Sequence, residues 1–191
     1  PESVHRELAA WVTARAIVPV GAPFPLVIGA AGHPKDSNLY QATRIPTYLC
    51  FGRRPVVEQG GIILVPAACP EDAGDGPGER KFFEWLSRSG GPEEVVRTAR
   101  EKGYPAGGQR TVMVAWALMV ARIAIIGARS PAVVRACGFE SFETLEEAVA
   151  WGRAETGANR LLAVPRALTT LPEAGDPAPE LSPNRVGKSV D

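Results

Sequence analysis

Four short apolar runs, separated by segments with helical patterns, constrain the fold of this chain more than any other feature. The runs cover residues 26–30, 62–65, 123–126 and 161–164. Each is continuous rather than alternating, which is typical of a strand buried on both faces of a parallel sheet. Helices between successive strands supply the crossovers that parallel strands require. The sequence therefore predicts an α/β domain with a mostly parallel sheet of about four strands. Helices should flank both faces in a Rossmann-like, three-layer arrangement.

The segments between the runs carry the start and stop signals of helices. Residues 2–16 place apolar side chains at helical spacing, and Thr144 is followed by two glutamates that suit the first turn of a helix. A helix that begins at residue 38 meets Pro46 within a few turns. Proline should break or kink it there, unless a second helix begins at that point.

Length and composition predict one folded domain with a tail. The chain has 191 residues, 45% of them hydrophobic, which is enough for a substantial core. From residue 172 onward it is rich in proline, glycine and charge, so we expect a folded domain over residues 1–171 and a disordered tail over 172–191. The chain begins at Pro1 just ahead of a helical pattern, as expected of a cut at a domain boundary.

Charge, hydropathy and cysteine usage exclude several functional classes. With 21 basic and 21 acidic residues, the chain offers no electrostatic reason to bind nucleic acid or an anionic membrane. No apolar run approaches the roughly 20 residues that span a bilayer. The three cysteines are odd in number and widely spaced, which argues against a disulfide framework and favours a reducing compartment. No leader pattern is present, so we expect a cytoplasmic protein.

The residues best suited to carry chemistry lie just after the first apolar run. Residues 32–44 are expected to form a strand end, a polar loop and the start of a helix, which is where ligands bind in open α/β sheets. On that helix Tyr40, Gln41 and Arg44 share one face. A guanidinium can hold a carboxylate in a fork, and an amide and a phenol can bond the remaining oxygens of a hydroxy acid. The alternative is a capped helix with solvated polar residues.

His33 lies at the mouth of this predicted site. A metal site usually needs three or four clustered ligands, and the only other histidine is His5. We therefore expect no metal site in this chain. For His33 two alternatives remain open: a contact with substrate or another domain, or simple solvation in a loop.

The same stretch resembles a signature of the nickel-dependent lactate racemase family. Residues 32–44 read Gly-His-Pro-Lys-Asp-Ser-Asn-Leu-Tyr-Gln-Ala-Thr-Arg. They are similar to Gly-Gly-Tyr-Pro-Lys-Asp-x-Asn-Leu-Tyr-Gln-Ala-x-Lys in the C-terminal domain of that family. Further pieces follow in the family's order and extend the resemblance over roughly residues 1–172: Gly60-Gly61, Ala68-Cys69, Asp75-Gly76-Pro77-Gly78, Phe82-Phe83-Glu84-Trp85-Leu86 and Gly107-Gly108-Gln109-Arg110.

The resemblance implies a function for the chain as part of a larger isomerase. Members of the family are two-domain racemases whose active site lies between the domains. Their N-terminal domain carries a nickel pincer nucleotide on a lysine, together with the histidines that ligate nickel and act as acid and base. The C-terminal domain binds substrate, with Tyr40, Gln41 and Arg44 at the corresponding positions here. We thus expect no catalytic residue and no cofactor in this chain, and no activity without the N-terminal domain. The implied partners are that domain and a small 2-hydroxy acid.

Three departures from the signature bear on the substrate. Arg44 stands where the family has lysine, Gly32-His33 replaces a glycine-tyrosine pair, and Pro46 interrupts a helix that the family continues. These departures leave two alternatives open. Beside the lactate-like racemase that the resemblance implies, the chain can belong to a relative that acts on a different hydroxy acid, or to a non-catalytic binding module that kept the fold.

Overall fold

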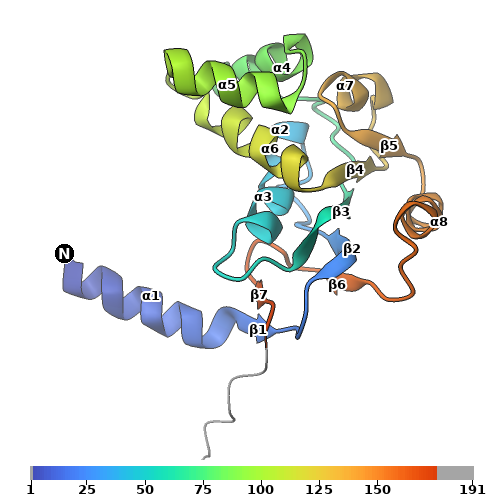
Figure 1. Ribbon diagram of the computed structural model, residues 1–191. Coiled ribbons are helices and arrows are strands. Elements are labelled where there is room, and N and C mark those ends of the chain that lie inside the picture. The colour runs from blue at the N-terminus through green and yellow to red at the C-terminus, as the bar shows by residue number, and fades with distance from the viewer. Residues whose placement is uncertain (1, 176–191) are drawn as a thin grey trace, which may run out of the picture.

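A parallel five-stranded sheet forms the centre of the computed structural model, which describes residues 2–175 (Figure 1). The strands lie in the order β5-β4-β3-β2-β6, and every neighbouring pair is parallel. Their bounds are Phe24–Gly29 for β2, Val57–Pro66 for β3, Arg122–Ile126 for β4, Glu140–Phe142 for β5 and Leu162–Val164 for β6. All four predicted strands are present, so the predicted α/β class and mainly parallel sheet are confirmed.

In the central sheet, the strand that the sequence did not predict is β5. It has three residues, all half-buried, and it forms an edge of the sheet with β4 as its single neighbour. An edge strand packs less apolar surface than a central one, so it needs no continuous apolar run. The polar residues Glu140 and Ser141 leave no continuous apolar run at this strand.

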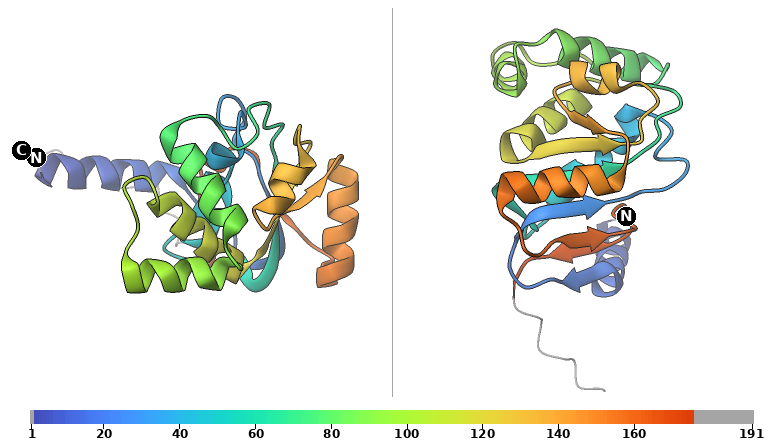
Figure 2. Two further views of the ribbon diagram at one scale, coloured as in Figure 1. Left: turned by 90° about the horizontal axis from the view of Figure 1, so that it is seen from above. Right: turned by 90° about the vertical axis from the view of Figure 1, so that its right-hand side faces the viewer.

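Side chains alternate between two apolar layers, one on each face of the sheet. Leu26, Ile62 and Leu64 face α8 (Leu145–Thr156), whereas Val27, Ile63 and Val65 belong to the larger cluster on the opposite face. That second face is covered by α3 (Arg44–Cys50) and α6 (Gln109–Val120). In Figure 2, α8 lies alone on one side of the sheet and the green and yellow helices lie on the other. The predicted three-layer arrangement is therefore confirmed.

The remaining helices of the body are α2 (Leu39–Ala42), α4 (Pro77–Arg88), α5 (Pro92–Lys102) and α7 (Pro131–Ala136). Three of them begin at a proline, whose missing N–H costs nothing in the first helical turn. Helix α8 begins instead with a capping box, in which Thr144 Oγ1 accepts from the Glu147 amide at 3.2 Å. The start that the sequence predicted at Thr144 is confirmed.

Pro46 does not kink one long helix. The chain forms two helices, with α2 ending at Ala42 and α3 beginning at Arg44 after the single residue Thr43. Pro46 is the third residue of α3, where no intrahelical partner awaits its amide. Of the two outcomes that the sequence allowed at Pro46, the start of a second helix is therefore the observed one.

The two ends of the described chain meet outside the main sheet. Helix α1 (Glu2–Ala16) leads into β1 (Ile17–Pro19), which pairs in parallel with β7 (Leu171–Glu173). The predicted boundary at residue 172 falls within β7. Pairing with β1 supplies backbone hydrogen bonds that composition does not reveal. The rest of the predicted tail, residues 176–191, lies outside the described residues. Helix α1 buries no side chain, and no helix within residues 2–175 is long and apolar enough to cross a bilayer.

Candidate functional site

Two loops at the carboxyl ends of β2 and β3 are joined by backbone hydrogen bonds. Because the strands are neighbours and parallel, residues 30–38 and 67–76 emerge at the same edge of the sheet. Three bonds connect these loops: Cys69 N to Asp36 O at 2.9 Å, Glu71 N to Ser37 O at 3.0 Å, and Leu39 N to Asp72 O at 2.8 Å. This pairing fixes where α2 begins and therefore positions the residues of the predicted site.

Asn38 anchors the start of α2 from inside the protein. It is 3% exposed, and its Oδ1 accepts from the backbone amide of Gln41 at 2.9 Å. Its Nδ2 donates to Glu71 Oε2 at 2.9 Å and approaches Glu79 Oε1 at 3.5 Å. One side chain thus caps the helix and ties it to the loop after β3 and to α4.

Gln41 and Arg44, which the sequence places on one helix face, are in direct contact. Arg44 Nε donates to Gln41 Oε1 at 3.0 Å, across the junction between α2 and α3. Lys35 Nζ approaches the same oxygen at 3.5 Å. Both members of the pair are half-buried. Among the described residues, no hydrogen-bond partner occupies the Nη groups of Arg44 or the carboxamide nitrogen of Gln41. These donors therefore remain available to a ligand.

Tyr40 is held by aromatic packing rather than by its two predicted neighbours. Its ring packs edge-on against the buried Phe82 of α4, with centroids 5.6 Å apart and an interplanar angle of 84°. A β carbon built on Gly78 would lie 3.9 Å from the hydroxyl, so that hydroxyl sits beside the start of α4. The sequence placed Tyr40 on one helix face with Gln41 and Arg44. The structure instead connects it with a residue of α6.

That residue is Arg110, to which the sequence analysis assigned no role. It is the second residue of α6, and its Cζ lies 5.9 Å from the Tyr40 ring centroid. Its Nη1 donates to Thr47 Oγ1 of α3 at 3.2 Å, while its buried Nε has no partner. Burial lowers the pKa of Arg110, and the positive charge of Arg44 lowers it further. The one signal in the sequence was its position just after Gly107-Gly108.

Arg44 and Arg110 place two guanidiniums at this edge of the domain, without a carboxylate partner among the described residues. Within residues 2–175 neither guanidinium lies within 4.0 Å of a carboxylate oxygen, the distance that defines the ion pairs found elsewhere. Two guanidiniums that raise each other's electrostatic energy favour an anion between or beside them. The arrangement can bind and orient a small anion.

His33 lies apart from this cluster. Its side chain is 87% exposed, and its Nδ1 is 3.9 Å from Asp36 Oδ1, three residues along the same loop. No hydrogen bond or ion pair joins it to Tyr40, Gln41 or Arg44 in the described part of the chain. A role for His33 in binding stays a prediction.

The described residues provide no ligand set for a metal ion. Within residues 2–175 no three or more His, Cys, Asp or Glu side chains gather in a way that could hold one. All three cysteines are free and buried, and burial raises the pKa of Cys50, Cys69 and Cys137 to about 12. For Cys69 the charges of Asp36 and Asp72 add to that effect. These thiols therefore stay protonated at neutral pH, whereas a metal ligand must be a thiolate.

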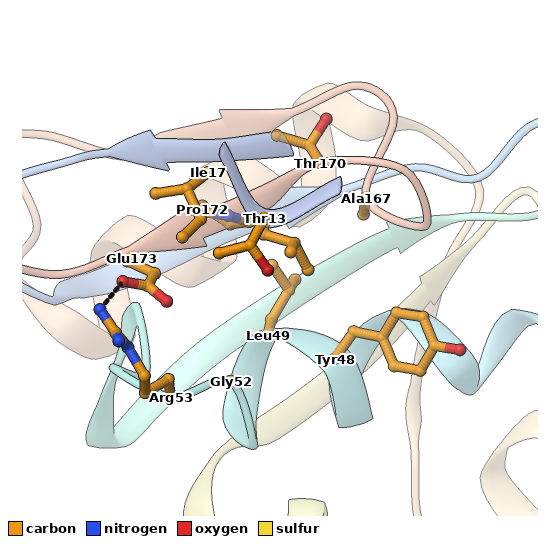
Figure 3. A pocket seen from close by; sticks show the side chains of 11 residues that line it. Thr13, Ile17, Tyr48, Leu49, Gly52, Arg53, Ala167, Thr170, Pro172 and Glu173 are labelled. Atoms are coloured by element: carbon orange, nitrogen blue, oxygen red, sulfur yellow. Dashed lines mark hydrogen bonds and ion pairs between the residues drawn. The ribbon is translucent and has the colours of Figure 1, made fainter. Parts of the chain in front are cut away.

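A cavity of about 310 Å³ lies on the other side of α3, against the sheet of the chain ends (Figure 3). Its lining is largely apolar and includes Ile17, Leu49 and Pro172. At one end Arg53 Nη2 and Glu173 Oε2 form an ion pair at 3.3 Å. None of the predicted site residues lines this cavity, so it belongs to the packing of β1 and β7 against the body.

Comparison with known proteins relates the domain to one family. The family model described as the lactate racemase C-terminal domain matches residues 24–169. Among solved structures, the lactate racemase apoprotein from Thermoanaerobacterium thermosaccharolyticum superposes with a TM-score of 0.75 at 18% sequence identity. The match covers 88% of this chain and 40% of that chain, so this chain spans about two-fifths of that protein. No curated protein matches the sequence.

Proposed function

The chain belongs to the family of lactate racemase C-terminal domains, and from this we propose that it is the substrate-binding domain of a nickel-pincer-dependent 2-hydroxyacid racemase. The observation that carries the proposal is the Gln41–Arg44 pair at the carboxyl edge of the sheet, with its free donors. Ligands of open α/β sheets bind at this edge. The matched family supplies the class of ligand, a 2-hydroxy acid.

In the proposed site Arg44 binds the substrate carboxylate through its two Nη groups. Gln41 accepts from Arg44 Nε, which orients the guanidinium and leaves the carboxamide nitrogen to donate to a substrate oxygen. The Tyr40 hydroxyl, at the edge of the same cluster, bonds the substrate's hydroxyl or remaining carboxylate oxygen. A charge-assisted hydrogen bond of this kind contributes about 1.5–3 kcal/mol. In this proposal the domain binds the substrate and orients it.

The nickel pincer nucleotide does not fit this chain as its holder. The described residues offer no cluster of ligands and no thiolate at neutral pH. We therefore place the cofactor in an N-terminal domain of the full-length protein, together with the residues that exchange the proton. In this proposal neither Lys35 nor His33 helps to hold the cofactor.

The proposed partners follow from the same argument. The N-terminal domain is the first, since this chain spans only two-fifths of the solved relative. A small 2-hydroxy acid is the second, and we propose neither nucleic acid nor membrane as a third. Three free cysteines within a single domain favour a cytoplasmic location.

Racemisation by the complete protein tests the proposal. Full-length protein, produced with its nickel cofactor, is incubated with single enantiomers of several 2-hydroxy acids, lactate among them. Chiral chromatography then measures the appearance of the opposite enantiomer. We expect turnover of at least one acid by the full-length protein and none by residues 1–191 alone. Binding of these acids without turnover by the loaded protein would support the alternative of a non-catalytic module. Turnover by residues 1–191 alone would contradict the proposal that catalysis requires the N-terminal domain.

A further inference from the structure

We propose that Arg110 makes this site selective for 2-hydroxy acids that carry a second anionic group, of which hydroxy-dicarboxylates are the simplest class. The first carboxylate binds Arg44 and the second binds Arg110. This inference rests on the proposed function, because it takes Arg44 as the anchor of the first carboxylate. It assigns a role to a residue outside the segment of residues 32–44.

The placement of Arg110 is fixed from two sides. Thr47 Oγ1 accepts from its Nη1 at 3.2 Å, and the Tyr40 ring lies 5.9 Å from its Cζ. Thr47 is itself 3% exposed and donates to the Arg44 carbonyl at 2.8 Å. The threonine therefore links the guanidinium of α6 to the backbone of Arg44. This arrangement holds the second cation next to the proposed anchor rather than leaving it free on the surface.

The charge balance of the site points to a dianion. Arg110 and Arg44 are close enough for the charge of Arg44 to lower the pKa of Arg110, yet the described chain supplies neither with a carboxylate within 4.0 Å. Elsewhere the same chain neutralises a prominent arginine: Arg122 pairs with Glu140 at 3.0 Å and with Glu155 at 2.8 Å. A monocarboxylate would balance one of the two charges. A second anionic group would balance the other, which matters most when the site is closed off from water.

The substitution of the family's lysine by Arg44 agrees with this geometry. A guanidinium is planar and binds a carboxylate at two points, whereas an ammonium acts as a single charge. Two guanidiniums linked through Thr47 therefore offer two carboxylate positions. A ligand that fills both carries two anionic groups.

Turnover and binding test the inference together. The full-length protein is assayed with malate and with lactate, which differ by one carboxylate, and calorimetry measures binding of succinate and butyrate without turnover. Arg110→Met removes the charge and Arg110→Lys restores it. Arg100→Met is the matched control, because Arg100 lies over an aromatic ring, Trp116, at 5.0 Å but belongs to α5. Thermal unfolding confirms that each variant is folded.

We expect the wild type to prefer malate over lactate and succinate over butyrate. Arg110→Met should lower kcat/KM for malate and affinity for succinate by roughly 10- to 100-fold, with lactate and butyrate changed less than about threefold. Arg110→Lys should recover part of the loss, and Arg100→Met should leave the ratio unchanged. A purely structural role for Arg110 would lower all four values together and would overturn the inference.

The two proposals fail in different ways. If lactate is racemised as well as malate and the Arg110 variants do not alter the ratio, selectivity for a second anion is refuted while the racemase function stands. If no acid is racemised but succinate binds more tightly than butyrate in a manner that depends on Arg110, the racemase function falls and the second anion site stands. Equal binding of succinate and butyrate by the wild type refutes the site in either case.

Discussion

Gly29, the last residue of β2, lies so close to Ile45 of α3 that a β carbon at position 29 would be 2.5 Å from Ile45 Cγ2. The same β carbon would be 2.9 Å from Leu49 Cδ1 on the next turn of the helix. The absence of a side chain at Gly29 thus lets α3 pack directly on the end of the strand. Because Arg44 immediately precedes Ile45, this contact also sets the position of the proposed carboxylate anchor.

Gly29→Ala should destabilise the protein. The added methyl group meets two fully packed side chains, and overpacking of this kind costs roughly 1–3 kcal/mol. The measurement is the denaturant midpoint of unfolding, with the slope of the transition as a check on its cooperativity. Gly52→Ala is the control, since a β carbon there would meet only Tyr48 O, at 3.6 Å. Equal midpoints for the two variants would contradict the close packing described here.

Asn38→Ala should weaken both the fold and the site. The substitution removes the cap of α2 and leaves Glu71 without its donor, at an expected cost of about 1–3 kcal/mol. Asn38→Ser keeps an acceptor that can cap the helix, so it should recover part of the stability. Denaturant unfolding of the two variants checks this order. A serine variant that is less stable than the alanine variant would show that the cap contributes little.

Arg44→Ala should weaken substrate binding in the full-length protein without unfolding it. Loss of a charge-assisted pair with a carboxylate corresponds to about 10- to 150-fold in affinity. Arg44→Lys should lose less, since the charge is kept. Steady-state kinetics against a panel of 2-hydroxy acids measures both effects, and a change confined to KM would indicate equal contact in the ground and transition states.

Arg97→Ala is the control for this series, because Arg97 forms exposed ion pairs on α5, far along the chain from the predicted signature. Exposed pairs contribute at most about 1 kcal/mol to stability. It should not alter kinetics. If Arg44→Ala leaves kcat/KM unchanged for every acid that is turned over, the proposed anchor is wrong.

The three cysteines should be unreactive in the folded chain and reactive once it unfolds. Burial raises the pKa of Cys50, Cys69 and Cys137 to about 12, so the thiolate that attacks a disulfide reagent is scarce at neutral pH. Titration with a chromogenic disulfide at pH 8 should count none in buffer and three in denaturant. Fast reaction of any one of them in buffer would show that it is accessible.

The same shift has a consequence for alkaline stability. The folded thiols keep their protons above the ordinary pKa of 9.0, whereas the unfolded thiols lose them. The folded state then binds more protons than the unfolded one, so stability falls as pH rises. We expect the cysteine contribution to be complete below about pH 9 and to be lost between pH 9 and 12. Replacing the three cysteines by alanine should flatten this part of the profile.

The sequence predicted the four longer or more apolar strands of the central sheet because each contains a continuous apolar run. Such a run is typical of a parallel strand that is buried on both faces. The strands β5, β1 and β7 were missed for a physical reason. Strands of three residues at a sheet edge or in a two-stranded sheet are stabilised by backbone hydrogen bonds to a neighbouring strand. Such bonds do not require any particular pattern of apolar residues in the sequence. Pro172 within β7 made a strand there still less apparent.

Contacts within the candidate site were predictable where they are local in sequence. Gln41 and Arg44 are three residues apart, and their contact survives the break at Thr43. Tyr40 was placed on the same face, but Phe82 draws its ring toward α4. Arg110 comes from a helix much later in the chain, and only the packing of α3 against α6 brings it to Thr47. No local pattern reports such a contact.

The small sheet of β1 and β7 also determines how the domain would respond to mechanical load. The two strands are parallel and lie near the two ends of the described chain. Ile17 pairs with Leu171, Val18 with Pro172 and Pro19 with Glu173. Tension applied between the N-terminal side of β1 and the C-terminal side of β7 therefore loads this pair in shear. Two further contacts tie this end of the chain to the body: Ala174 N donates to Arg54 O at 3.2 Å, and Arg53 pairs with Glu173 at 3.3 Å. The strand pair and these contacts would have to break before the same tension reached the five-stranded sheet.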